Sequence, residues 1–130
     1  GILCAAVADF TPDHTADHKI KRGKDGMTIQ LKPTKDIAAS LGATKKEGQV
    51  LVGFALETND EQQNAKGKLE RKNFDFIVLN SLNDKGAGFR VDTNKISIID
   101  RQDTTSYPLK NKSEVAKDII DRLVQTLNKN

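Results

Sequence analysis

The stretch QVLVGFALETNDEQQNAKGKLERKNFDFIVL, residues 49–79, decides the fold class. It contains two apolar segments, residues 49–56 and 74–79, and near-continuous apolar runs of this length are typical of strands buried on both faces. The polar segment between them has acidic residues at its start and carries Ala65 and Leu69 four positions apart, as in an amphipathic helix. A strand, a helix and a second strand in this order predict parallel strands joined by a right-handed crossover.

The residues before this stretch extend the pattern. Residues 2–8 (ILCAAVA) predict another strand buried on both faces, with Cys4 as a small buried side chain. Residues 27–31 (MTIQL) alternate between apolar and polar and predict a short strand. Thr34 is a suitable N-cap for a short helix, and Gly42 is a suitable residue to end it.

After the glycines at 86 and 88 the pattern changes. Residues 95–100 and 104–109 flank a short turn and predict a hairpin at the edge of the sheet, where Pro108 is tolerated. A final helix is expected from Ser113, with apolar residues at helical spacing that we expect to be core: Val115, Ala116, Ile119, Ile120, Leu123, Val124 and Leu127. The expected fold is α/β, a three-layer Rossmann-like arrangement with a mostly parallel sheet, an edge hairpin and a C-terminal helix.

Composition limits the classes of protein. The chain has 130 residues with a net charge of +3, 36% hydrophobic and 30% charged residues, which excludes a disordered tail. Its longest apolar run is far shorter than the roughly 20 residues of a membrane span, so we expect no membrane partner. A single cysteine favours a reducing compartment, the cytoplasm. The chain opens within a strand-like run, so we expect residues 1–130 to be the C-terminal portion of one larger domain.

Polar residues follow the three predicted parallel strands. They are Asp9, the segment 57–59 (ETN) and the segment 80–81 (NS). In an open parallel sheet, ligands bind beyond the carboxyl ends of the strands. Asp9 favours a ligand most, because a carboxylate that ends an apolar strand needs a partner. The alternative is that these residues only form turns and helix caps.

Two pairs of lysines are candidates for binding anions. Lys19 and Lys21 point the same way in an extended chain, so both ammonium groups can meet one phosphate chain. Lys68 and Lys72 are four residues apart on one helix face, a spacing that is mildly unfavourable unless an anion lies there. Solvated surface charge is the alternative for both pairs.

Several common catalytic motifs are absent from the sequence. It contains no GxGxxG, Walker A, CxxC, HExxH or GxSxG pattern. His14 and His18 lie in a segment without a helical pattern, so a metal site there is not expected. The aromatic residues fall mostly within strands, which gives little support to a surface for stacking bases.

Taken together and in order, six short motifs resemble one enzyme family. The motifs are AAVADF (5–10), KIKR (19–22), PTKDI (33–37), GFALET (53–58), KLERKNFD (68–75) and GF..D.N (88–94). Across about residues 3–94 the chain is similar to phosphopantothenate–cysteine ligase, also called phosphopantothenoylcysteine synthetase. In most bacteria this enzyme is the C-terminal half of a bifunctional coenzyme A biosynthesis protein of the DNA/pantothenate metabolism flavoprotein family.

The resemblance implies a reaction in two steps. The carboxylate of 4′-phosphopantothenate attacks the α-phosphate of CTP, which releases pyrophosphate and leaves an acyl-cytidylate. The amine of cysteine then displaces CMP. Phosphoryl chemistry of this kind depends on positioning and charge neutralisation, so lysines and Mg²⁺ matter more than a protein nucleophile.

The resemblance also implies roles for particular residues. Lys19 would be catalytic and would stabilise charge at the transferring phosphoryl group, supported by Lys21 and Arg22 from a flap at about residues 13–26. Asp9 would hold the cytidine end of CTP. The other residues expected to bind CTP are Ala5, Ala6, Thr34, Lys35, Asp36, Ile37, Phe54, Lys68 and Lys72. Three positions depart from the usual family residues, namely Arg22, Lys35 and Leu56.

The resemblance extends to the context of the chain. It implies a homodimer in the cytoplasm, with the flap and nearby strands at the contact. FMN would bind only in a fused decarboxylase domain outside this chain. A glycine-rich nucleotide segment and a functional asparagine would lie upstream of Gly1, so we expect residues 1–130 alone to be inactive. No metal ligand is assigned.

Two other functions fit the residues. A Rossmann-like module could bind a nucleotide without ligase activity. A nucleic-acid-binding domain is suggested by the pI of about 9.0 and the basic flap, but the excess charge is small for that role, and we expect no nucleic-acid partner. The use of CTP rather than ATP follows from the resemblance alone.

Overall fold

The computed structural model describes residues 1–81 and 91–129, which divide into two compact units. We call Ala5–Ile37 the arm. We call Gly1–Cys4, together with the described residues from Ala38 onward, the sheet unit. Each unit is described by itself.

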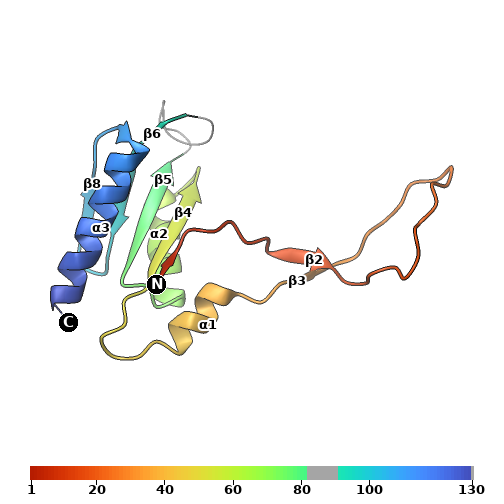
Figure 1. Ribbon diagram of the computed structural model, residues 1–130, viewed down its shortest axis with the longest axis horizontal. Coiled ribbons are helices and arrows are strands. Elements are labelled where there is room, and N and C mark those ends of the chain that lie inside the picture. Colours follow the sequence, from red (N-terminus) through yellow and green to blue (C-terminus); the bar gives the residue numbers. More distant parts are fainter. Residues whose placement is uncertain (82–90, 130) are drawn as a thin grey trace. The chain divides into compact units, whose positions relative to one another are not determined.

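A five-stranded sheet forms the centre of the sheet unit, in the order β1-β4-β5-β7-β8 (Figure 1). The strands are β1 (Ile2–Leu3), β4 (Val52–Glu57), β5 (Phe76–Ser81), β7 (Ile96–Ile99) and β8 (Thr104–Ser106). β4 runs parallel to both β1 and β5, whereas β5–β7 and β7–β8 are antiparallel. The strand–helix–strand unit and the edge hairpin predicted from the sequence are therefore confirmed.

The described residues also contain three helices and a small second ladder. The helices are α1 (Ile37–Ala43), α2 (Glu61–Arg71) and α3 (Lys112–Lys129). β6 (Thr93–Asn94) pairs with β9 (Lys110–Asn111), directly before α3. The N-cap of α2 is Asp60, rather than Thr58 or Asn59 as the sequence predicts, and it adopts a left-handed φ of 45° without a side-chain capping bond.

The sheet is covered on both faces, which confirms the three-layer α/β class. One cluster of buried side chains includes residues of α3 and consists of Val50, Val52, Phe76, Val78, Ile96, Ile98, Val115 and Ile119. The other includes residues of α2 and consists of Leu51, Ala55, Ala65, Leu69, Phe74, Ile77, Leu79 and Ile99. Because successive side chains of a strand point to opposite faces, β4 and β5 contribute to both clusters.

The first strand is much shorter than the sequence predicts. β1 ends at Leu3, and residues 4–8 are exposed, so the predicted strand over residues 2–8 and the predicted burial of Cys4 are wrong. Within the described residues, β1 pairs only with β4, at the two positions Ile2↔Val52 and Leu3↔Gly53. An apolar run alone does not show how many neighbours a strand has, and among the described residues this strand has one.

The arm contains a short antiparallel ladder. β2 (Phe10–Pro12) pairs with β3 (Leu31–Pro33), so the strand predicted over residues 27–31 lies later in the chain than expected. Thr34 does not cap α1, because its Oγ1 donates a hydrogen bond to the Ala8 carbonyl at 2.6 Å. The Thr34 hydroxyl is engaged by the Ala8 carbonyl, so the prediction that Thr34 caps the helix, which considered neighbouring residues only, is wrong.

Gly42 has a different role from the predicted helix stop. It lies inside α1 and is buried. A Cβ added at Gly42 would lie 2.0 Å from the Lys72 carbonyl oxygen, and Asn73 Nδ2 donates to the Gly42 carbonyl at 3.0 Å. The glycine is required because the backbone that follows α2 approaches α1 too closely for any side chain.

α3 is only partly core, contrary to the prediction for its whole apolar stripe. Val115 and Ile119 are buried and Leu123 packs against them, but Ala116, Ile120, Val124 and Leu127 are exposed. Val115, Ile119 and Leu123 pack against the sheet, and the wider apolar stripe of α3 continues beyond that contact. Pro108 falls after β8, outside the strand in which it was expected. Gly86, Gly88 and the start of the GF..D.N motif lie outside the described residues.

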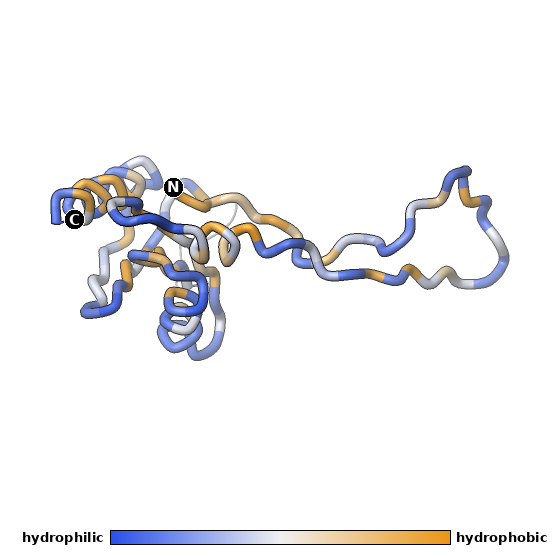
Figure 2. The backbone as a smooth tube through the Cα atoms, turned by 90° about the horizontal axis from the view of Figure 1, so that it is seen from below, coloured by the Kyte–Doolittle hydropathy of each residue, from blue (hydrophilic) through white to orange (hydrophobic). Residues whose placement is uncertain are grey.

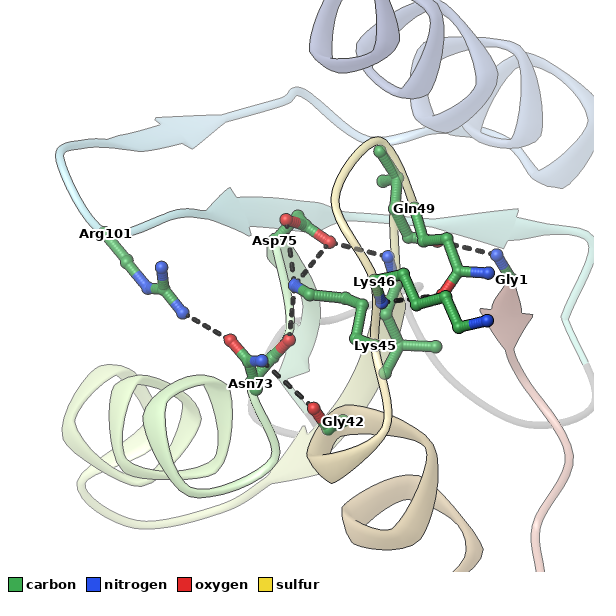
Figure 3. A network of polar contacts seen from close by, with 10 residues as sticks. Gly1, Gly42, Lys45, Lys46, Gln49, Asn73, Asp75 and Arg101 are labelled. Atoms are coloured by element: carbon green, nitrogen blue, oxygen red, sulfur yellow. Dashed lines mark hydrogen bonds and ion pairs between the residues drawn. The ribbon is translucent and has the colours of Figure 1, made fainter. Parts of the chain in front are cut away.

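A polar network connects the segments that precede β4 and β5 (Figure 3). The Asp75 carboxylate accepts from Lys45 Nζ at 3.0 Å and from the Leu51 backbone N–H at 2.6 Å. Asn73, at a left-handed φ of 51°, accepts from Arg101 Nη2 at 2.8 Å. Asparagine tolerates this backbone conformation better than most residues. Through Asn73 and Arg101, the network joins the end of α2 to the hairpin turn.

The hairpin turn is organised by Asp100. Its Oδ1 accepts from the backbone N–H groups of Gln102 and Asp103 at 2.8 and 2.7 Å, and its Oδ2 accepts from the Arg122 guanidinium on α3. Partial burial by itself raises the pKa of the Asp100 carboxyl. The backbone N–H groups and Arg122 outweigh burial, so this pKa lies below its ordinary value of 3.8.

We predict that Gly42→Ala lowers the free energy of unfolding by about 1–3 kcal/mol, because the new methyl group meets backbone atoms that cannot rotate away. Urea unfolding followed by circular dichroism measures the change. Gly67→Ala on α2 is the matched control, since its Cβ would meet only the flexible Arg71 side chain. We expect Gly67→Ala to be neutral or stabilising. Equal effects of the two substitutions would contradict the close-approach explanation.

We predict that Asp100→Asn costs about 1–3 kcal/mol of stability at pH 7. Because the folded-state pKa is depressed, the stabilisation is fully present above the ordinary value of 3.8 and is lost as the pH falls through the lower, folded-state value. The difference between wild type and variant should therefore shrink below pH 3.8. Urea unfolding from pH 7 to pH 2 tests this, with the exposed Asp121→Asn as a control. A difference that does not depend on pH would refute the linkage.

Candidate functional site

Polar side chains gather at the carboxyl ends of β4 and β5. We call this group the crest and define it as Glu57, Glu61, Asn80, Ser81 and Asn94. Glu57 and Ser81 are opposite each other in the parallel register, so both strands end at the same level. Ser81 Oγ donates to Glu61 Oε1 at 2.6 Å, and Asn94 Nδ2 donates to Asn80 Oδ1 at 2.7 Å. Glu57 and the segment 80–81, which belong to two of the three polar groups predicted at strand ends, therefore lie side by side.

Lys68 reaches the crest from α2. Its Nζ donates to Glu57 Oε1 at 2.6 Å, and the two side chains are 37% and 14% exposed. The distance is short because charge-assisted hydrogen bonds are shorter than neutral ones. Lys68 thus presents a partly exposed ammonium group at the end of the sheet where a ligand is expected.

Lys72 and Phe54, the other two site residues predicted in the sheet unit, lie outside the crest. Lys72 is the C-cap of α2, where its backbone N–H donates to the Lys68 carbonyl, and its side chain is half-buried. Phe54, in the middle of β4, is half-buried and packs against the core cluster on the α3 side. Packing against the core thus explains why Phe54 is half-buried. The contacts of Phe54 and Lys72 with a nucleotide remain predictions.

The arm carries the other predicted site residues. Asp9 is exposed and directly precedes β2, so it does not end a buried strand, and burial gives no reason for it to need a partner. The Thr34 N–H donates to the Asp9 carbonyl at 2.9 Å, so these two residues lie together at the end of the β2–β3 ladder opposite the connecting loop. Exposed positions are also found for Ala5, Ala6, Lys35, Asp36 and Ile37.

The loop of the arm is basic and exposed. Residues 14–30 are all exposed, and they include the flap expected at about 13–26 except for the half-buried Asp13. Residues 20–27 curve around an open space of about 740 Å³, and this part of the loop contributes the positive charges of Lys21, Arg22 and Lys24. The grouping of Lys19 with Lys68 and Lys72 joins residues of the two units and remains a prediction.

Two contacts of the crest were not predicted from the sequence. The ion pair between Glu57 and Lys68 joins residues 11 positions apart, and the bond between Asn94 and Asn80 spans 14 positions. No local spacing rule covers such contacts. The only available signal was the placement of polar residues directly after buried strands.

The described parts of the chain offer neither a metal cluster nor a membrane-spanning helix. Residues 1–81 and 91–129 contain no group of three or more His, Cys, Asp or Glu that could hold a metal ion. Within the same residues, none of the helices has the length and apolar character needed to cross a bilayer.

The fold defines a Rossmann-like α/β domain with polar side chains at the carboxyl ends of β4 and β5. A profile of the DNA/pantothenate metabolism flavoprotein C-terminal domain family matches residues 1–127. The chain belongs to this family, as the six motifs indicated, and the match extends beyond the segment that carried the resemblance.

Curated relatives show similarity along almost the whole chain. The chain is 46% identical over 123 residues to the coenzyme A biosynthesis bifunctional protein CoaBC of Bacillus subtilis, covering 94% of this chain and 30% of that protein. It is 60% identical over 124 residues to a protein named cysteine/cysteine sulfinic acid decarboxylase from an unknown prokaryotic organism, covering 95% and 34%. The chain therefore spans about a third of the length of these relatives.

Solved structures show the same fold. The C-terminal domain of a coenzyme A biosynthesis bifunctional protein CoaBC superposes with a TM-score of 0.74 at 31% identity, over 97% of this chain and 53% of that one. A Cab2 mutant H337A in complex with phosphopantothenate-cysteine gives a TM-score of 0.69 at 20% identity, over 97% and 43%, and at that identity the likeness concerns the fold.

Proposed function

We propose that this chain is the C-terminal part of a phosphopantothenate–cysteine ligase that acts in coenzyme A biosynthesis. The observation that carries the proposal is the family match over residues 1–127, strengthened by the similarity to the C-terminal domain of CoaBC. The substrates are 4′-phosphopantothenate, cysteine and CTP. The first step forms an acyl-cytidylate and releases pyrophosphate, and the second forms the amide and releases CMP.

The chain's own contribution to this reaction is positive charge. Lys68 at the crest and Lys19 in the arm loop are the residues that neutralise phosphate oxygens as negative charge develops on them. Lys72, Lys21 and Arg22 add to this field. The polar backbone and side chains near Asp9 and Thr34, together with the other predicted contacts, orient the nucleotide.

Mg²⁺ accompanies CTP in this proposal. The described residues hold no group of three or more potential metal ligands, so they do not form a cage for the ion, and we assign no ligand to it. Mg²⁺ is expected to bind the phosphate oxygens and to reduce their negative charge. FMN would bind only in a fused decarboxylase domain outside this chain, which is consistent with the flavoprotein family and with the decarboxylase name of one relative.

The assembly in this proposal is a cytoplasmic homodimer formed through the arm. Large apolar side chains on the arm are 49–65% exposed, and they are Val7, Phe10, Ile20, Met27, Ile29, Leu31 and Ile37. Figure 2 shows these hydrophobic stretches among the hydrophilic residues of the arm. So much exposed apolar surface on a thin segment favours burial against another chain.

A Rossmann-like module that binds a nucleotide without catalysing the ligation is the second candidate. Lys68 and the other basic residues would serve such a module equally well, since cationic side chains bind and orient an anion without requiring a reaction. A variant of the proposed catalytic residue distinguishes the two candidates.

We predict that Lys19→Gln in the full-length protein lowers the turnover number about 10²–10³-fold while the Kd for CTP changes less than about 3-fold. Pyrophosphate release and isothermal titration calorimetry measure the two quantities. Lys24→Gln, in the same exposed loop, is the control with an equal loss of charge and should retain turnover. The binding module would instead be supported if the unsubstituted protein showed no turnover and Lys19→Gln weakened its binding of CTP.

We also predict that Leu31→Glu converts the dimer to a monomer, because a charged carboxylate would have to be buried at the contact. Analytical ultracentrifugation of the full-length protein measures the change. Gln30→Glu, at the adjacent exposed position, adds the same charge and should leave the dimer intact. A dimer that survives Leu31→Glu would place the contact elsewhere.

A further inference from the structure

Lys68 is held by a specific partner at the crest. The Glu57 carboxylate receives the Lys68 ammonium at 2.6 Å, and no step of the proposed reaction uses Glu57. A carboxylate beside a site for a triphosphate repels the phosphate groups, so its presence there points to another task. The geometry around both side chains indicates what that task is.

Glu57 is itself fixed in place. It is the last residue of β4, it lies opposite Ser81 in the register of two buried strands, and its side chain is only 14% exposed. Its second carboxylate oxygen lies 3.4 Å from Asn64 Nδ2, and the same amide donates to the Asn59 carbonyl at 2.9 Å. The carboxylate is therefore held by the strand on one side and by α2 on the other.

Lys68 keeps donors free for a ligand. A lysine ammonium has three N–H donors, and the bond to Glu57 uses one of them. The Lys68 side chain remains 37% exposed, compared with 14% for Glu57. A lysine with a long flexible stem loses rotamer freedom when it binds an anion, and a lysine that is already held loses less.

We propose that Glu57 is a positioning residue that holds the Lys68 ammonium at the crest, oriented toward the phosphate groups of the nucleotide. This inference rests on the proposed function for the identity of the ligand. Glu57 strengthens nucleotide binding by ordering Lys68 in advance, and this gain exceeds the repulsion between its carboxylate and the phosphates. It does not touch the substrate.

A double-mutant cycle in the full-length protein tests the proposal. The four proteins are wild type, Glu57→Gln, Lys68→Gln and the double variant, and the Kd for CTP is measured by calorimetry. Glu57→Gln should weaken binding about 3–10-fold when Lys68 is present and less than about 2-fold in the Lys68→Gln background. Equal losses in both backgrounds, or tighter binding by Glu57→Gln, would overturn the proposal.

A matched control separates this effect from a general change of charge. Glu70→Gln removes a carboxylate from an exposed position on the same helix, and its Kd for CTP should stay within about 2-fold of wild type. Thermal unfolding of each variant identifies any loss of folding. A Glu70→Gln effect as large as that of Glu57→Gln would refute a specific role for Glu57.

A second measurement needs no nucleotide. The acylation rate of each lysine by a water-soluble active ester, followed by mass spectrometry, reports how strongly each ammonium is held. Glu57→Gln should raise the rate at Lys68 several-fold and leave the exposed Lys66 on the same helix unchanged. No change at Lys68 would show that Glu57 does not hold it. A wild-type protein that fails to bind CTP would refute the proposed function, whereas the acylation rates still decide the Glu57–Lys68 contact.

Discussion

The parallel pairing of β4 with β5 is the constraint on which the sheet unit depends. Six residues of each strand pair in register, from Val52↔Phe76 to Glu57↔Ser81. Because both faces of these strands are buried, a shift by one residue would move every side chain to the wrong core cluster. The register is therefore fixed by packing, and with it the level at which both strands end. The crest owes its geometry to the packing of the two core clusters.

The sequence predicted the elements whose patterns are local. Residues 49–79 gave the strand–helix–strand unit because strands buried on both faces leave near-continuous apolar runs. The predictions for residues 2–8, Thr34 and Gly42 failed for a different reason. The end of β1, the donor role of Thr34 and the close approach at Gly42 all depend on residues far along the chain.

The candidate site divides in the same way. Polar residues after buried strands pointed to the crest, since strand ends are visible in the hydropathy pattern. The pairing of Lys68 with Glu57 was not visible, because it depends on how α2 crosses back over the sheet. The roles of Lys19, Asp9 and their neighbours on the arm came from resemblance to a family, and physical reasoning on the residues alone left solvated charge as an alternative.

The two units differ in how well they shield their own backbone. All residues of Ala5–Ile37 are at least partly exposed, and a ladder of three residue pairs is the regular pairing within that segment. The amide protons of residues 14–29 should therefore exchange with deuterium almost as fast as those of an unstructured peptide, while β4 and β5 exchange only through global unfolding. Protection that appears in the arm when another chain or a ligand is added would map its contact directly, residue by residue.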